Sequence, residues 1–263
     1  MKANWKFALM GFAALAFVAC NQPAGGGDDP DDPEGEYVKP ISVSDNSLAD
    51  WDKLPAEFVF EAKCPADAAS LGLKSVKVYA DQYYIFIQVE PNPEDILDLE
   101  WVPFHVYINT DNSDMTGGYG DEFTDANADI LLEGAVFGVK DAASFAEAAI
   151  PWAPGVYKWW GEVGGSGWEW TDPSTEHTAD DKWGAIVGEG ELQGTTSQFV
   201  NGKFEIEIMR ELVPTTAGWN ENEFGIGFDI QQAWSSVGIL PLVSPTDENP
   251  YGYTNKLQVK INK

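Results

Sequence analysis

The first residues in this chain that could do chemistry are the acidic side chains between two apolar runs, 104–108 and 130–132. No Lys or Arg stands between Asn109 and Asp129 to pair with them. Carboxylates placed so closely repel one another unless water or a cation compensates their charge. Calcium suits such a segment, because its protein ligands are carboxylate and carbonyl oxygens. We predict a calcium site built from Asp111, Asp114, Asp125, Asn127 and Asp129.

Turn formation is the alternative explanation for these acidic residues. Asp and Asn favour turns because their side chains hydrogen-bond to nearby backbone groups. The spacing is not that of an EF-hand, since Ile130 stands where that loop requires Gly. Both explanations stay open at the level of sequence.

A second candidate site is the Trp-rich stretch 155–171, GVYKWWGEVGGSGWEWT, which we expect to form a hairpin turning at its glycines. Trp rings offer large, rigid contact areas that can stack on the apolar faces of sugar rings. Alternate members of a hairpin must face inward, so about half of these rings would be core. We predict that carbohydrate is bound by Trp159, Trp160, Trp168 and Trp170, with Trp183, Trp219 and Trp234 as secondary candidates.

Catalytic motifs are scarce. His105 and His177 are the only histidines, and His105 is expected to be a hydrogen-bonded structural residue on a strand. The chain has no serine-nucleophile elbow, zinc-protease motif or phosphate-binding loop. A glycoside hydrolase needs only two carboxylates, so that class remains an alternative in a chain so rich in Asp and Glu.

The N-terminal segment is typical of an exported, lipid-anchored protein. Residues 1–19 have a basic start and an apolar run that is too short to span a bilayer, as in a secretory signal. Small residues precede Cys20, which resembles a bacterial lipoprotein site where this Cys carries the lipid. Residues 20–36 are rich in Gly, Pro and Asp and form a flexible acidic tether. The acidic residues soon after Cys20 resemble the export signal of surface-displayed lipoproteins in some Gram-negative bacteria, which implies an anchor in the outer membrane, at the cell surface. A solvated linker is the alternative explanation for these residues.

The net charge limits the kinds of ligand that the protein is expected to bind, and the cysteine content limits the disulfides that it can form. The formal net charge is −28, which disfavours nucleic acid and anionic lipid headgroups as ligands. With Cys20 lipidated, Cys64 has no intramolecular partner, so no disulfide framework is expected.

The remaining residues, 37–263, predict one all-β domain. About a dozen short apolar runs alternate with turn residues, and a single helix is expected at Asp141 to Ile150. This pattern favours an antiparallel, jelly-roll-like β-sandwich with one short helix. Strands are expected at 41–43, 76–80, 83–90, 104–109, 185–192, 198–200, 203–209, 224–230 and 257–261, with a loop at 234–253.

Four strand motifs follow one another along the chain: ISVSDN at 41–46 followed by Asp50-Trp51, VKVYADQYYI at 76–85, FHVYINTD at 104–111 and FEIEI at 204–208. Their succession resembles the family 9 carbohydrate-binding and DOMON-like sandwiches. The resemblance implies a jelly-roll-like sandwich that binds sugar, in some members with structural calcium. We therefore expect a non-catalytic surface lipoprotein that binds carbohydrate. A structural or protein-interaction module is the alternative from another class.

Overall fold

The computed structural model describes residues 37–263 except 67, 69–70, 119–125, 168, 172–177, 179 and 243–256. The expected signal peptide and tether, with Cys20, lie outside the described residues, as do Asp125, Trp168 and His177. Residues from Lys39 onward form one compact unit. Among the helices of these ranges, none has the length and hydrophobicity needed to cross a bilayer.

The described ranges form an all-β structure, as the sequence predicts. The strands are β1 Val59–Lys63, β2 Leu73–Asp81, β3 Tyr84–Pro91, β4 Val102–Asn109, β5 Ile130–Phe137, β6 Gly155–Trp159, β7 Trp170–Thr171, β8 Trp183–Val187, β9 Thr195–Val200, β10 Lys203–Met209, β11 Glu223–Gln232, β12 Ser235–Leu240 and β13 Leu257–Asn262. The helices are α1 Phe145–Ala148 and the 3-10 turns η1 Ala49–Lys53, η2 Ala56–Phe58 and η3 Arg210–Leu212.

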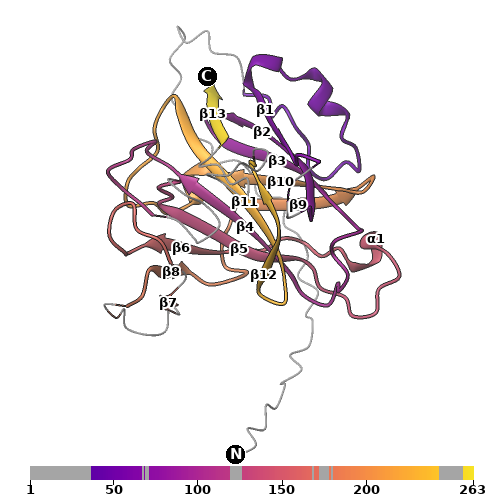
Figure 1. Cartoon of the computed structure of the whole chain (residues 1–263). Coiled ribbons are helices and arrows are strands. Elements are labelled where there is room, and N and C mark those ends of the chain that lie inside the picture. Colours follow the sequence, from indigo (N-terminus) through magenta and orange to yellow (C-terminus); the bar gives the residue numbers. More distant parts are fainter. Residues whose placement is uncertain are drawn as a thin grey trace, which may run out of the picture. The chain divides into compact units, whose positions relative to one another are not determined.

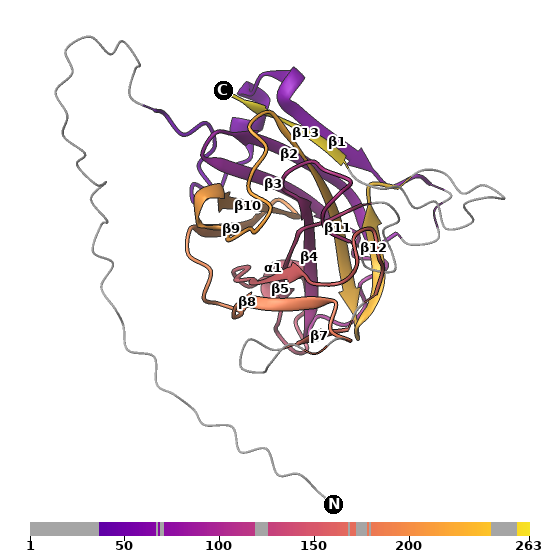
Figure 2. The ribbon, with the colours of Figure 1, turned by 90° about the vertical axis from the view of Figure 1, so that its left-hand side faces the viewer.

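The strands join in one curled sheet with the order β7-β8-β6-β5-β4-β11-β13-β2-β3-β10-β9. β1 pairs with β2 and β12 with β11, outside that path. Most pairs are antiparallel, and the short β13–β2 and β7–β8 pairs are parallel. Figure 1 shows β4, β5 and β6 side by side in one half of the sheet, and Figure 2 shows β2, β3 and β10 in the other. The curl makes the fold sandwich-like, because side chains of both halves share one core.

Alternating apolar residues of β4 and β11 anchor this core. Phe104 stacks on Phe228, with ring centroids 6.0 Å apart and planes within 9° of parallel. Trp152 packs edge-on against Phe104, and its indole N–H donates to the carbonyl oxygens of Phe104 and Gly134 at 3.3 and 3.1 Å. Offset and edge-on ring pairs add to the free energy gained from burial alone. This packing holds β4 and β11 in place, and the opposite face of these two strands carries polar residues.

The opposite face of β2, β3 and β10 is also buried, under the chain at 41–59. Ile41, Val43 and Trp51 pack with Tyr79 and Phe86 in a second apolar cluster. Aromatic residues occur on both faces of the expected strand 83–90, which predicts a strand buried on both faces. β3 is buried in this way, with Phe86 on one face and Ile85 and Ile87 on the other, although Tyr83 in the preceding turn is exposed. The segment 41–59 also covers the side of β10 that carries its carboxylates.

Alternation along 203–209 predicts that Phe204, Ile206 and Ile208 face the core while Glu205 and Glu207 face solvent. The second part is wrong, because the covering segment buries both carboxylates. Glu205 accepts hydrogen bonds from Trp51 Nε1 at 2.7 Å and from Gln198 Nε2 at 2.5 Å. Glu207 pairs with Lys39 Nζ at 2.9 Å. Each buried carboxylate thus has a partner brought to it by a distant segment or a neighbouring strand.

The turns follow the sequence closely at two hairpins. Asn201 and Gly202 have φ of 52° and 81°, the left-handed conformations that a tight β9–β10 turn requires. At the β2–β3 turn, Asp81 Oδ1 accepts the backbone N–H groups of Tyr83 and Tyr84 at 2.8 and 2.7 Å. Asp81 therefore sets the turn by its side chain, and the turn residues are Gln82 and Tyr83.

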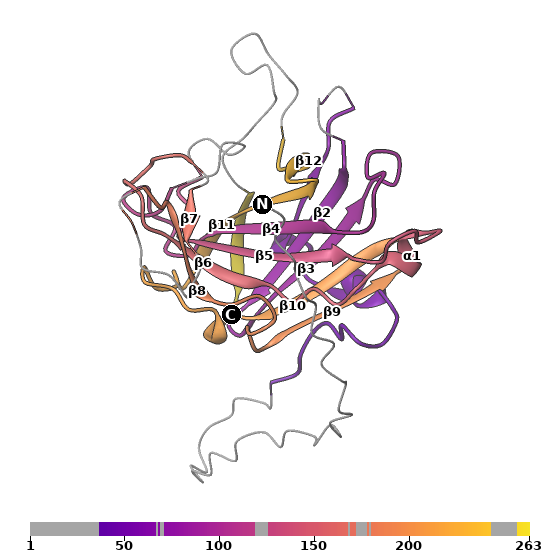
Figure 3. The same cartoon turned by 90° about the horizontal axis from the view of Figure 1, so that it is seen from below.

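Several expected elements differ from the structure. The helix is a single turn, capped by Ser144, whose Oγ accepts Glu147 N–H at 3.3 Å. Figure 3 shows α1 beyond the end of β5, where Phe137 forms a bridge with Ala149. Residues 41–43 form no strand although Ile41 and Val43 are buried, and β12 lies inside the expected loop 234–253.

The expected Trp hairpin is also wrong. β6 pairs antiparallel with β8 instead of with β7, and β7 pairs parallel with β8. Trp183 of β8 is fully buried and lies edge-on to Trp159, with centroids 5.1 Å apart. Burial of Trp183 between its neighbours therefore favours β8 over β7 as the partner of β6.

Replacing Glu205 by Ala tests the second cluster. The buried N–H groups of Trp51 and Gln198 would lose their acceptor, which costs the desolvation of each donor. We expect the free energy of unfolding at neutral pH to fall by about 2–4 kcal/mol, measured by urea unfolding. The exposed Glu57→Ala serves as the control, with a change of less than about 0.5 kcal/mol. Equal effects of the two substitutions would contradict this role of Glu205.

The pH dependence of stability offers an independent test of the same site. Burial raises the pKa of Glu205, although hydrogen bonds from Gln198 and Trp51 oppose this. The folded protein therefore holds the proton to higher pH than the unfolded chain, and the contribution of Glu205 to stability falls as pH rises through the raised pKa. We expect the stability of the wild type relative to Glu205→Gln to decrease from pH 4.5, the ordinary value, towards pH 7. A constant difference across urea titrations at these pH values would refute it.

Candidate functional site

The acidic connection after β4 is held by hydrogen bonds within the chain. Asp129 Oδ2 accepts the backbone N–H and the hydroxyl of Thr110 at 2.8 and 3.1 Å. Asp111 accepts the Ser113 N–H at 3.0 Å and the Thr116 hydroxyl at 3.0 Å. Burial raises the pKa of Asp129, and the charge of Asp111 raises it further. The two carboxylates are thus close enough to interact, and each also has its own donors.

The other predicted calcium ligands lie beside this pair or outside the described residues. Asn127 Nδ2 donates to Asp114 Oδ1 at 3.3 Å. Asp125 falls in the range 119–125, which the structure does not describe. Among the described residues, no three His, Cys, Asp or Glu side chains are grouped so that they could hold a metal ion. The calcium site remains a prediction whose ligand set depends on Asp125.

Trp159 packs against the acidic connection. A Cβ atom on Gly118 would lie 2.1 Å from the Trp159 ring, and one on Gly161 would lie 2.4 Å from it. Its indole N–H donates to the Glu162 carbonyl oxygen at 2.9 Å, and its ring meets Trp183 edge-on. The ring therefore fills a space that only glycines leave open, and its surface is largely used in packing.

Trp160 lies over a glycine in the same way. A Cβ on Gly184 would come within 2.3 Å of the half-buried Trp160 ring, and Lys158 Nζ lies 5.1 Å from its centroid. Trp168 lies outside the described residues, and for Trp170 the structure describes the backbone in β7. Of the four predicted sugar-binding residues, Trp159 and Trp160 are thus the ones whose side chains the structure describes, and each ring packs over a glycine of another segment.

A buried charge cluster occupies the outer face of β4, β5 and β11. His105 Nε2 lies 2.7 Å from Glu133 Oε2, and its Nδ1 lies 3.6 Å from Asp229 Oδ2. Gln231 Nε2 donates to Asp229 Oδ2 at 2.7 Å, and the Ser236 hydroxyl donates to Asp229 Oδ1. Burial raises the pKa of Asp229, while His105 opposes this. His105 is thus buried on a strand with polar partners at its ring nitrogens, and its purely structural role stays a prediction.

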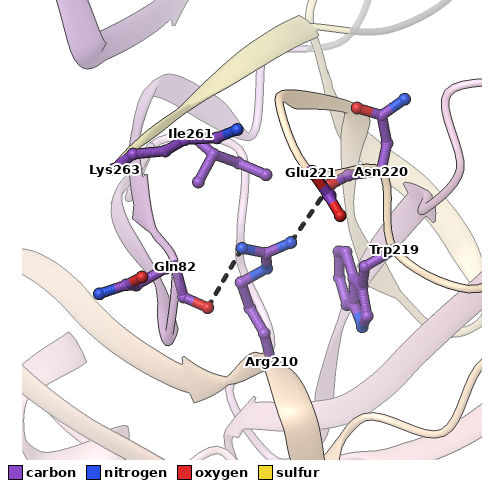
Figure 4. A pocket seen from close by; sticks show the side chains of 7 residues that line it. All are labelled: Gln82, Arg210, Trp219, Asn220, Glu221, Ile261 and Lys263. Carbon is purple, nitrogen blue, oxygen red and sulfur yellow. Dashed lines mark hydrogen bonds between the residues drawn. The ribbon is translucent and has the colours of Figure 1, made fainter.

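The clearest candidate binding site is a cavity of about 380 Å³ at the β2–β3 turn, which falls in the size range of small-molecule sites. Figure 4 shows Arg210 between Gln82 and Trp219, with Ile261 and Lys263 across the space. The lining residues are Gln82, Arg210, Trp219, Asn220, Glu221, Ile261 and Lys263, and we call this cavity the Arg210 pocket. Four separate segments supply them, so the fold itself assembles the pocket.

Arg210 is the buried centre of the pocket, with only 7% of its surface exposed. Its Nη1 donates to the carbonyl oxygens of Asp81 and Gln82 at 2.9 and 3.4 Å, and its Nη2 donates to that of Asn220 at 3.4 Å. Its guanidinium carbon lies 4.9 Å from the centroid of the Trp219 ring. Phe224 supports that ring edge-on at 5.7 Å. The pocket thus combines an aromatic ring, a fixed guanidinium and an amide.

Sequence patterns do not reveal this pocket. Trp219 was only a secondary candidate, and Arg210 follows the β10 alternation without any motif around it. The residues come from 82, 210, 219–221 and 261–263, which meet only in the folded sheet. A buried Arg in a chain of net charge −28 is the signal that could have pointed there, but burial is not visible in the sequence.

Comparisons with known proteins assign this chain to no family. No protein-family model matches the chain, and neither a curated protein nor a solved structure matches it. The functional argument therefore rests on the residues and their geometry.

Chelation tests the calcium prediction. An ion that binds only the folded protein must raise its stability, so adding EGTA should lower the melting temperature and added calcium should restore it. The measurement is differential scanning calorimetry of the wild type and of Asp114→Asn, in which the effect of the chelator should be smaller. A melting temperature that does not respond to EGTA or to calcium would contradict the predicted calcium site.

Proposed function

We propose that this protein is a non-catalytic carbohydrate-binding lipoprotein of the outer membrane, held at the cell surface by a lipid on Cys20. The observation that carries the proposal is the Arg210 pocket. Sugar sites combine an aromatic ring with convergent hydrogen-bonding groups, because sugars have apolar carbon faces and many hydroxyls. Trp219 supplies the ring, and Gln82 and Asn220 supply amides.

The surroundings of the pocket favour binding over chemistry. Glu221 is the single carboxylate among its lining residues, and it is exposed. Hydrolysis of a glycosidic bond usually requires two carboxylates that flank that bond. The half-buried Glu133 and the buried Asp229 belong to the cluster around His105, where both approach the same imidazole. A glycoside hydrolase has less support from the described residues than a sugar-binding protein.

A protein-interaction module remains the second candidate because of exposed apolar side chains. Leu97, Trp101, Val139 and Trp234 are 81%, 44%, 40% and 64% exposed. Leu97 N–H donates to Gln232 Oε1 at 3.3 Å, which places the 97–101 loop beside the β11–β12 turn. Trp234 has a φ of 63°, an unusual conformation for a bulky residue and one often retained for function.

Binding measurements on a panel of polysaccharides test the proposed function. We expect affinity electrophoresis and calorimetry to show a ligand for the wild type, and Trp219→Ala to weaken its binding about tenfold or more by removing the ring contact. Reducing-sugar assays on the same panel should detect no product.

Three variants locate the ligand. Gln82→Ala changes an exposed residue of the pocket and should weaken binding without unfolding the protein. Trp234→Ala removes an exposed Trp outside the pocket lining and should leave affinity unchanged. A loss of binding in Trp160→Ala alone would move the site to β6, and no binding to any glycan by the intact protein would reject the function.

A further inference from the structure

Arg210 forms no ion pair with a carboxylate of the described residues. Its guanidinium donates to three backbone carbonyl oxygens, and no described carboxylate lies within ion-pair distance of it. Asp81 is the nearest charge that acts on it, but Asp81 Oδ1 accepts the N–H groups of Tyr83 and Tyr84. A buried charge without a partner is costly, since burial removes its hydration.

The donors of Arg210 are not all used. Its Nε is buried and has no hydrogen-bond partner among the described residues, and Nη2, which carries two hydrogens, donates to the Asn220 carbonyl oxygen. Burial lowers the pKa of Arg210, although the charge of Asp81 opposes this. An arginine nonetheless stays protonated at neutral pH, so the pocket contains a fixed positive charge with hydrogen-bonding capacity to spare.

A second cation lies across the pocket. Lys263 lines the pocket and is exposed, and its Nζ donates to Asn222 Oδ1 at 3.0 Å. An anion in the pocket would therefore lie near Lys263 as well as Arg210. Figure 4 shows Lys263 and Ile261 on the side opposite Arg210. Glu221 is the acidic member of the lining, and its exposure leaves its charge screened by solvent. Arg210 and Lys263 thus bring two side-chain cations to the pocket, together with the side-chain carboxylate of Glu221.

We propose that the Arg210 pocket binds an acidic sugar, whose carboxylate or sulfate group lies between Arg210 and Lys263 while Trp219 and Ile261 contact its carbon skeleton. This inference rests on the proposed carbohydrate-binding function and names the class of sugar. The ligand anion supplies the direct ion-pair partner that Arg210 does not have among the described residues. Elsewhere the net charge of −28 repels polyanions, so recognition of an acidic glycan must be local to the pocket.

Matched pairs of glycans test the inference by calorimetry on the full chain. The probes are oligogalacturonates and oligoglucuronates against their methyl esters, and sulfated against desulfated galactan oligomers. We expect at least one acidic probe to bind about tenfold or more tightly than its neutral counterpart, because a charge-assisted hydrogen bond is lost in the neutral form. The pair that shows the difference tells whether carboxylate or sulfate is the recognised group.

Substitutions assign the effect to the pocket. Lys263→Gln changes an exposed residue and should reduce affinity for the acidic probe about fivefold, with little change for the neutral one. Arg210→Lys keeps a cation but removes the planar donors, so it should reduce the affinity further, provided that its melting curve shows a folded protein. Lys53→Gln, an exposed cation paired with Asp50 outside the pocket, is the matched control and should bind as the wild type does.

The outcomes separate this inference from the proposed function. Equal affinity for acidic and neutral partners, or an unchanged Lys263→Gln, would overturn the acidic sugar and leave carbohydrate binding standing. No binding to any probe, neutral or acidic, would reject both. Binding of a glutamate-rich peptide as tightly as the best acidic glycan would also overturn the inference, because the pocket would then recognise carboxylates without a sugar.

Discussion

The structure depends on one constraint: its central strands are buried on both faces, so the polar residues of one face need partners inside the protein. β4 shows this most fully, since every residue of that strand is buried. Its Phe104 face packs in the shared core, and its His105 face meets Glu133 and Asp229. On β10, Trp51 and Gln198 donate hydrogen bonds to Glu205, and Lys39 pairs with Glu207. A buried charge without a partner lowers stability, so the segments that carry these partners must pack over the sheet.

Much of the fold is visible in the sequence for a local reason. Strand alternation, as in Phe204, Ile206 and Ile208, follows from the pleat of a strand, and the Asn201-Gly202 turn follows from the φ values that it needs. The all-β class, the strand positions around 104 and 204, and the capped helical turn at Ser144 could be predicted for this reason. Each of these features depends on residues that are near one another in the chain.

The remaining features depend on residues far apart in the chain. Pairing of β6 with β8 reflects the burial of Trp183, and the fit of Trp159 depends on Gly118. Neither the partner strand nor the space above a glycine is encoded near the Trp residues themselves. The Arg210 pocket is the strongest case, because its walls come from the β2–β3 turn, η3, the 219–221 loop and β13. A ranking of Trp residues by local pattern therefore placed Trp219 below those of the 155–171 stretch.

The contact of Lys39 with Glu207 has a mechanical consequence. Lys39 Nζ lies 2.9 Å from Glu207 Oε2 and 5.2 Å from the centroid of the Tyr84 ring, and Trp51 is bonded to Glu205 on the same strand. A pulling force that enters the domain at residue 39 therefore loads the β10 contacts one after another, before it reaches the ladder between β3 and β10. The segment 39–51 would therefore detach from β10 before the pairing of β10 with β3 is loaded.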